Sequence, residues 1–196
     1  MRRCALHARL GLTNPPTTGE LDFSFFAALL SNLSPDPAAQ GTERFVDLGS
    51  GAGKAVACAA LTQNFQSVVG VELLPELYEA SVSAKADVVR LAGAAGIGLP
   101  AEYDLAYGNM LQYPDLSSAD VVYCHATCLE QSTVQALAWN LEYHLKPGGR
   151  VVLMSKQLSL ADAPSFVPYG PGVIPAPQGH AAEARLACFL YVKRRG

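Results

Sequence analysis

The sequence predicts an α/β protein with a Rossmann-like, doubly wound and mostly parallel sheet. Short apolar runs typical of strands alternate with segments of helical periodicity over residues 44–158. The segments between the strands are long enough to hold crossover helices, so we expect parallel pairing with right-handed connections. Half of the 196 residues are hydrophobic, which is enough for a sizeable core.

The first predicted elements are a helix, a strand, a second helix and a second strand. Residues 21–33 carry apolar side chains at helical spacing, and the run Ser34-Pro35-Asp36-Pro37 ends that helix. Residues 45–48 form a short apolar strand. After a run of glycines, residues 55–61 predict a buried helix and residues 67–73 a second strand.

A long helix, two strands and another helix come next. Residues 75–95 predict the long helix, and Pro75 opens it, where the missing N–H of a proline costs nothing. Strands are expected over residues 103–107 and 120–124, and a helix over residues 129–145.

The last part of the chain contains a fifth strand over residues 150–158 and a final strand over residues 185–192. Between them, prolines and glycines from Ser159 onward predict a long loop, which is either a surface segment beside a site or a connection without function. The prolines of this loop are Pro164, Pro168, Pro171, Pro175 and Pro177.

Charge and cysteine content indicate the setting of the protein. The formal net charge is −3, and we interpret the basic run at residues 193–195 as a solvated end. No apolar run approaches the ~20 residues that cross a bilayer, so no membrane partner is expected. Five scattered cysteines are typical of free thiols in a reducing compartment, and none of them completes a metal site. We expect the cytoplasm, with the nucleus or the mitochondrion as alternatives.

A glycine-rich turn, Gly49-Ser50-Gly51-Ala52-Gly53, follows the first strand and opens a helix. Such a turn lets a ligand approach the backbone, and N–H groups at a helix start favour negative charge. The Gly-x-Gly-x-Gly spacing differs from the Gly-x-Gly-x-x-Gly of nicotinamide enzymes. Because Asp47 precedes the turn inside the strand, the site disfavours a pyrophosphate and suits a ligand that bears an ammonium group.

Two further strands end in residues that suit a nucleoside. Glu72, with Leu73 beside it, lies 19 residues beyond Gly53, where a carboxylate can accept hydrogen bonds from both ribose hydroxyls. Asn109 can accept from an adenine amino group, and Met110 can cover the ring. Taken singly, each residue has an ordinary alternative role: Asp47 as a helix cap, Glu72 as a surface carboxylate and Asn109 as a turn former. Together they lie at the carboxyl ends of successive parallel strands, where open α/β sheets bind ligands.

These residues resemble the cofactor site of class I S-adenosylmethionine-dependent methyltransferases. The resemblance is carried by Phe45-Val46-Asp47-Leu48-Gly49-Ser50-Gly51-Ala52-Gly53-Lys54 and by Val69-Gly70-Val71-Glu72. More narrowly, residues 18–156 resemble the non-SET histone lysine methyltransferases of the disruptor-of-telomeric-silencing type. Thr18-Gly19-Glu20 is similar to that family's Tyr-Gly-Glu loop, and Gly108-Asn109-Met110-Leu111 to its Gly-Asp-Phe-Leu. Residues 145–150, with Ser155-Lys156, are similar to its sequence into the fifth strand.

The resemblance implies that S-adenosyl-L-methionine is the cofactor. Asp47, Gly49, Gly51 and Lys54 would then surround its methionine part. Glu72 would hold the ribose, and Asn109 with Met110 the adenine. Thr18 and Glu20 would close over it as a loop, and Ser50, Gly53 and Leu73 complete the expected cofactor-binding set. Thr18, Asn109, Met110 and His125 stand where the family has Tyr, Asp, Phe and Asn.

His125 follows the fourth strand, where the resemblance places the transferred methyl group. Methyl transfer from a sulfonium is an in-line displacement, so the nucleophile must be held about 3–3.5 Å from the methyl carbon. A histidine with a pKa near 6.5 could take a proton from a substrate amine or hydroxyl. The alternative is a packed histidine without a chemical role in the apolar stretch 121–128. Thr127 is expected to orient the substrate.

The predicted function is methyl transfer, with a protein lysine as the favoured acceptor. The alternatives are a small molecule or a nucleic acid as acceptor, and a non-catalytic scaffold that binds S-adenosylmethionine. Asn14-Pro15-Pro16-Thr17 resembles the Asn-Pro-Pro-aromatic signature of amino-group methyltransferases but lacks the aromatic residue. With a net charge of −3, the isolated chain has little with which to bind a nucleosome.

We expect one methyltransferase domain over residues 1–196. Residues 1–41 would form an N-terminal loop and helix that close over the site. Residues 42–158 would form the cofactor-binding core, and residues 159–196 the Pro/Gly-rich segment with the final strand.

Overall fold

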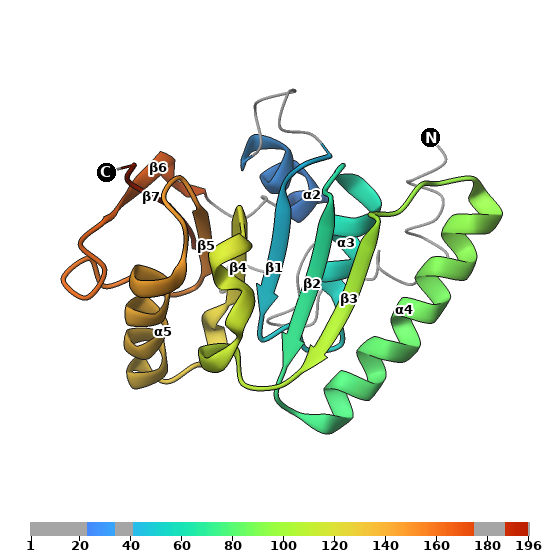
Figure 1. The fold of residues 1–196 in the computed structure, drawn as a ribbon, viewed down its shortest axis with the longest axis horizontal. Helices are drawn as coiled ribbons and strands as arrows, with labels where there is room; N and C mark the ends of the chain where they lie inside the picture. Colours follow the sequence, from blue (N-terminus) through green and yellow to red (C-terminus); the bar gives the residue numbers. More distant parts are fainter. Residues whose placement is uncertain (1–22, 34–40, 175–186, 196) are drawn as a thin grey trace, which may run out of the picture.

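The computed structural model describes residues 23–33, 41–174 and 187–195. Its centre is a seven-stranded sheet in the order β3-β2-β1-β4-β5-β7-β6 (Figure 1). Strands β1 to β5 pair in parallel, and β7 runs antiparallel between β5 and β6. The strands are β1 Arg44–Leu48, β2 Ser67–Glu72, β3 Glu102–Tyr107, β4 Val121–His125, β5 Arg150–Met154, β6 Phe166–Ile174 and β7 Cys188–Lys193. The predicted doubly wound, mostly parallel sheet is confirmed.

Helices cover both faces of the sheet and bury two apolar layers. One layer joins the sheet to α2 (Phe23–Leu33), α3 (Lys54–Thr62) and α4 (Pro75–Ala95). The other joins it to α5 (Gln131–His144). In the first layer the Phe26 ring of α2 lies 4.6 Å from the Tyr123 ring and 6.3 Å from the Phe45 ring, measured between centroids. The strands that helices cover on both faces are mostly apolar, as in other parallel sheets.

Helix α3 lies close to the sheet because its residues are small and its neighbour on β2 is a glycine. Every residue from Ala55 to Leu61 is buried, as the sequence predicts. A Cβ at Gly70 would come within 2.7 Å of Val56 Cγ2 and 2.9 Å of Ser50 Cβ. The missing side chain therefore lets the start of α3 and the preceding turn sit against β2.

Helix α4 begins and ends where its sequence indicates. Pro75 occupies the first turn, and Gly96 ends the helix with a left-handed φ of 65°, which a glycine adopts without strain. Within the described residues, no helix combines the length and the apolar character that a bilayer crossing requires.

The loop predicted after Ser159 is wrong for Phe166–Ile174, which forms the edge strand β6. Pro168 and Pro171 hid this strand in the sequence. An edge strand tolerates proline because one side makes no ladder hydrogen bonds, and the β6–β7 register shifts between Pro168 and Val173. The fifth strand also ends earlier than predicted, at Met154, because Ser155 takes a left-handed φ of 70°. Pro175 and Pro177 lie outside the described residues.

Candidate functional site

The predicted site residues lie along one edge of the sheet, at the carboxyl ends of β1 to β4. Asp47 of β1 pairs in register with Gly70 of β2 and with Tyr123 of β4. Glu72 ends β2 opposite Tyr107, the last residue of β3. Parallel strands therefore bring together side chains that are far apart in the sequence.

The glycine turn between β1 and α3 needs left-handed backbone at three positions. The φ angles of Gly49, Gly51 and Gly53 are 84°, 54° and 82°. A Cβ at Gly53 would lie 3.1 Å from the Cβ of Ser81, so this glycine lets the turn pack on α4. A Cβ at Gly51 would meet no atom within 4 Å, so the turn is open at this point to an approaching ligand.

Glu72 fastens this turn to the start of α4. Its Oε2 accepts a hydrogen bond from Gly51 N at 2.7 Å, and its Oε1 accepts one from Leu74 N at 2.8 Å. The side chain is buried, so the alternative of a surface carboxylate is wrong. Each carboxylate oxygen retains a lone pair, and the two backbone bonds fix its position for further donors.

Asp47 is a buried carboxylate with an orphan oxygen. The residue is 1% exposed, and its Oδ1 has no hydrogen-bond partner among the described residues. Burial, with a further contribution from the negative charge of Glu72, raises the pKa of Asp47 to about 8. A cation bound beside it would restore the charged form. Ser50 Oγ, in the adjoining turn, is also buried without a partner in the described part of the chain.

Asn109 and Met110 form the turn after β3. Asn109 Oδ1 accepts from Leu111 N at 2.9 Å and so caps the short helix η2 (Met110–Gln112). The interpretation of Asn109 as a turn former is therefore confirmed. Met110 is buried, and its Sδ lies 3.8 Å from the position of a Cβ on Gly49. Its contact with adenine stays a prediction.

His125 ends β4 with one ring nitrogen bonded and the other without a described partner. Its Nδ1 lies 3.1 Å from Tyr123 Oη, while the buried Nε2 has no partner among the described residues. Burial lowers the pKa of His125 below its ordinary value, so the ring is neutral near pH 7. Burial also raises the pKa of Tyr123 well above its ordinary value, so its phenol stays protonated. Tyr123 was not predicted as a site residue, because within an apolar strand it reads as core.

Thr127 and Ser155 form a hydroxyl pair next to His125. Thr127 Oγ1 lies 2.8 Å from Ser155 Oγ, so the pair joins the ends of β4 and β5. Among the described residues, Ser155 alone combines a positive φ with a side chain, a conformation that is strained outside glycine. In the sequence, Ser155 stands out only through the family resemblance of Ser155-Lys156.

Of the remaining four predicted site residues, the structure describes two. Lys54 begins α3, directly after the glycine turn. Leu73 is 55% exposed between β2 and α4. Thr18 and Glu20, predicted to close over the site, lie outside the described residues.

Comparison with protein families identifies the chain. The family model described as histone methylation protein DOT1 matches residues 13–164, more than three quarters of the sequence. The chain belongs to the DOT1 family. The class expected from the sequence, a class I S-adenosylmethionine-dependent methyltransferase of the DOT1 type, is confirmed, and S-adenosylmethionine is its cofactor. A search of curated protein sequences finds no match.

Solved structures resemble this DOT1 family member in fold. An RNA methyltransferase from Salinibacter ruber, in complex with S-adenosyl-L-homocysteine, has a TM-score of 0.60 at 21% identity, over 86% of this chain and 92% of the other. The N-methyltransferase NodS from Bradyrhizobium japonicum has a TM-score of 0.64 at 13% identity, over 89% and 100%. The putative methyltransferase YhhF from Escherichia coli has a TM-score of 0.62 at 12% identity, over 93% and 90%.

Proposed function

We propose that the chain transfers the methyl group of S-adenosylmethionine to an amine of a protein, with a lysine side chain as the favoured acceptor. The observation that carries the proposal is the buried Asp47 carboxylate, whose Oδ1 has no partner among the described residues. A carboxylate in this state suits a ligand with an ammonium group. The DOT1 family match supports a protein acceptor, because it continues through β4 and β5 to residue 164.

The residues of this edge fit the parts of the cofactor. Asp47 would accept from the amino group of its methionine part, and Ser50 Oγ is available for a second polar contact. The open face at Gly51 leaves room for close approach to the backbone. Glu72, fixed by the Gly51 and Leu74 amides, would accept from the ribose hydroxyls.

The sulfonium of the cofactor supplies the methyl group as an electrophile, so the protein must present a neutral amine. A lysine amine has an ordinary pKa near 10.4 and must lose a proton before it attacks. We assign this task to His125, and two observations support the assignment: its Nε2 makes no hydrogen bond to the described residues, and its pKa is lowered. For Nε2 to accept a proton, Nδ1 must hold the ring proton and donate it to Tyr123 Oη. Tyr123 would then be a positioning residue.

The Thr127–Ser155 pair supports an acceptor site beside His125. Both hydroxyls belong to residues at the ends of strands next to one another in the sheet. A strained backbone at Ser155 is of the kind that persists where function requires it. We assign these hydroxyls to orienting the acceptor amine.

The test is incubation of the full chain with S-adenosylmethionine labelled on its methyl group and fractionated cell extract, with Asp47→Asn as the inactive control. We expect label in the protein fraction and methyl-lysine in digests of the labelled bands. Label confined to nucleic acid or small molecules would contradict the protein acceptor. Saturable cofactor binding without transfer to any fraction would instead indicate a non-catalytic scaffold.

A further inference from the structure

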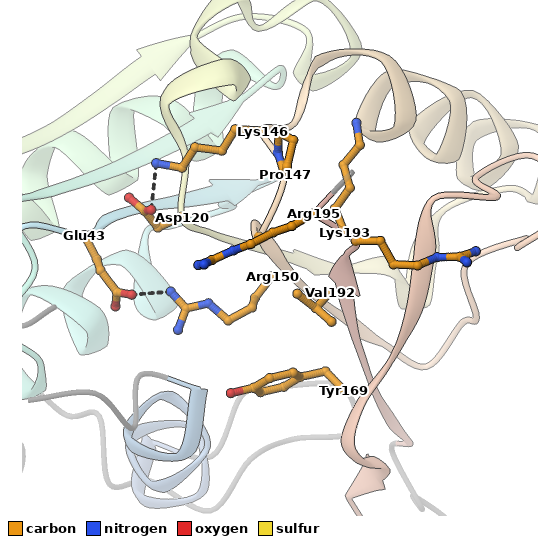
Figure 2. A pocket seen from close by; sticks show the side chains of 11 residues that line it. Glu43, Asp120, Lys146, Pro147, Arg150, Tyr169, Val192, Lys193 and Arg195 are labelled. Atoms are coloured by element: carbon orange, nitrogen blue, oxygen red, sulfur yellow. Dashed lines mark hydrogen bonds and ion pairs between the residues drawn. The ribbon is translucent and has the colours of Figure 1, made fainter.

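A cavity of about 440 Å³ lies at the other edge of the sheet, at the amino ends of its parallel strands (Figure 2). Glu43 and Asp120, which line it, directly precede β1 and β4, and Arg150 begins β5. Because β7 is antiparallel, its last residue, Lys193, reaches the same edge. Four residues of extended chain separate Glu43 at this edge from Asp47, a distance of roughly 13 Å.

The cavity is strongly basic. Its lining holds two carboxylates and an excess of three positive charges; the basic side chains are Lys146, Arg150, Lys193, Arg194 and Arg195. The expectation that residues 193–195 form a solvated end is wrong for Lys193, whereas Arg194 and Arg195 are exposed. Lys193 is a buried residue of β7, and Arg194 and Arg195 contribute to the wall.

Most of these charges are fixed by partners within the protein. Lys146 Nζ lies 2.6 Å from Asp120 Oδ1, and Arg150 pairs with Glu43, as the dashed lines in Figure 2 mark. Lys193 Nζ donates to Leu145 O at 2.8 Å, just after α5. These contacts neutralise both carboxylates and hold the wall in place.

Among the basic residues that the structure describes in this lining, Arg195 is the one whose side chain has no partner within the protein. Figure 2 shows its side chain reaching into the space between Lys146 and Arg150. Its guanidinium makes no hydrogen bond or ion pair within the described part of the chain. Gly148, with a φ of +83°, makes room for it, because a Cβ there would lie 3.1 Å from Arg195 Nε.

We propose that this cavity binds a small ligand through a phosphate group, held by Arg195 with Lys146 and Arg150 beside it. A guanidinium matches the geometry of phosphate oxygens with two parallel hydrogen bonds. The volume lies in the range of sites for small molecules, and the half-buried Tyr169 ring supplies one wall for an organic part. A nucleic acid backbone fits less well, because it needs a basic surface along its length and the chain has a net charge of −3.

The experiment titrates the full chain with inorganic phosphate, phenyl phosphate, phenol and a short oligonucleotide at matched ionic strength, and calorimetry follows the binding. We expect saturable binding of phenyl phosphate and none of phenol. Arg195→Gln should weaken binding by about tenfold or more, because it removes a charge-assisted contact. Arg90→Gln removes the same charge from an exposed position of α4 and should change the affinity less than about twofold. Unchanged melting temperatures would show that both variants fold.

The outcomes separate the sources of the phosphate group. Both supporting outcomes require that binding depends on Arg195. If phosphate binds as tightly as phenyl phosphate, the ligand is free phosphate. If phenyl phosphate binds more tightly than phosphate, the ligand is an organic phosphomonoester. Three results overturn the proposal. They are no saturation by either anion at about 10 mM, equal weakening by Arg90→Gln and Arg195→Gln, or Arg195-dependent binding of an oligonucleotide alone.

Discussion

At the scale of single residues, buried polar atoms without partners are the most informative feature of this protein. Asp47, Ser50 and His125 each have one in the described part of the chain, and all three lie at the same edge of the sheet. A buried polar atom without a partner costs about 1–3 kcal/mol of stability. Such a cost at three neighbouring positions is understandable if a ligand completes their hydrogen bonds.

The raised pKa of Asp47 predicts a pH-dependent stability of the protein without cofactor. The folded state binds this proton up to about pH 8, whereas the unfolded state releases it near pH 4. Stability contributed by Asp47 is therefore present at about pH 4 and declines as the pH rises to 8. Asp47→Asn should remove this decline and raise stability at pH 8 by about 1–3 kcal/mol relative to wild type. Denaturant unfolding of both proteins at pH 5 and pH 8 measures this difference in stability. If the stabilities of the two proteins changed with pH in parallel, Asp47 would be ionised in the folded protein without cofactor.

His125→Ala tests the proposed base. If His125 takes the acceptor's proton, turnover should fall by about 10²–10⁴-fold while cofactor affinity stays nearly intact. Wild-type turnover should also decline as the pH falls through the lowered pKa of His125, because only the neutral ring accepts a proton. Tyr123→Phe, which removes the hydroxyl near Nδ1, should move this pH profile.

A packed histidine without a chemical role would give a different result. His125→Ala would then lose about 1–3 kcal/mol of stability, while its folded fraction would turn over at a normal rate. Thermal melting, cofactor titration and turnover on the same variant separate the two roles.

Residues of the candidate site could be predicted only where a strand end and a chemical type coincided. Asp47, Glu72 and His125 were found in this way, and the structure gathers them. Tyr123 and Ser155 were missed for physical reasons. Tyr123 matters because its hydroxyl lies near His125. Ser155 matters because its backbone is left-handed. The residue type alone predicts neither property.

At the scale of elements, the contact between α3 and β2 positions the glycine turn. Gly70→Ala should destabilise the protein by about 1–3 kcal/mol, since the added methyl group meets Val56 and Ser50 in a packed layer. It should also weaken cofactor binding, because Ser50 belongs to the turn. Gly98→Ala is the matched control, as a Cβ there meets no atom within 4 Å. Denaturant unfolding and cofactor titration check both variants, and equal stabilities would show that the turn does not depend on Gly70.

The elements from β1 to α5 could be predicted because apolar periodicity and breakers agree there. Strand β6 could not, because it contains Pro168 and Pro171 and pairs only with β7. Its pairing depends on the tertiary position of an edge, which local patterns do not contain.

At the scale of the whole molecule, the sheet separates two chemistries. The carboxyl edge carries Asp47, Glu72 and His125, while the amino edge carries the basic cavity around Arg195. Because the net charge is −3 and the basic excess of the described residues gathers around one cavity, we expect the chain to offer a nucleosome little surface to bind. We predict about tenfold less label on nucleosomes than on extract protein at equal substrate mass in the methyl-transfer assay. Nucleosomes labelled as well as extract protein would show that charge does not limit the acceptor.

The central claim is that S-adenosylmethionine binds at the carboxyl edge of β1 and β2, and calorimetric titration of the full chain tests it most directly. Wild type should bind S-adenosylmethionine and S-adenosylhomocysteine with micromolar Kd. Glu72→Ala should weaken binding by about 1–3 kcal/mol, the scale of hydrogen bonds to a charged group. The control Glu76→Ala, in the exposed first turn of α4, should leave Kd unchanged. No saturation by either ligand at millimolar concentration would contradict the account, and an unchanged affinity in Glu72→Ala would place the ribose elsewhere.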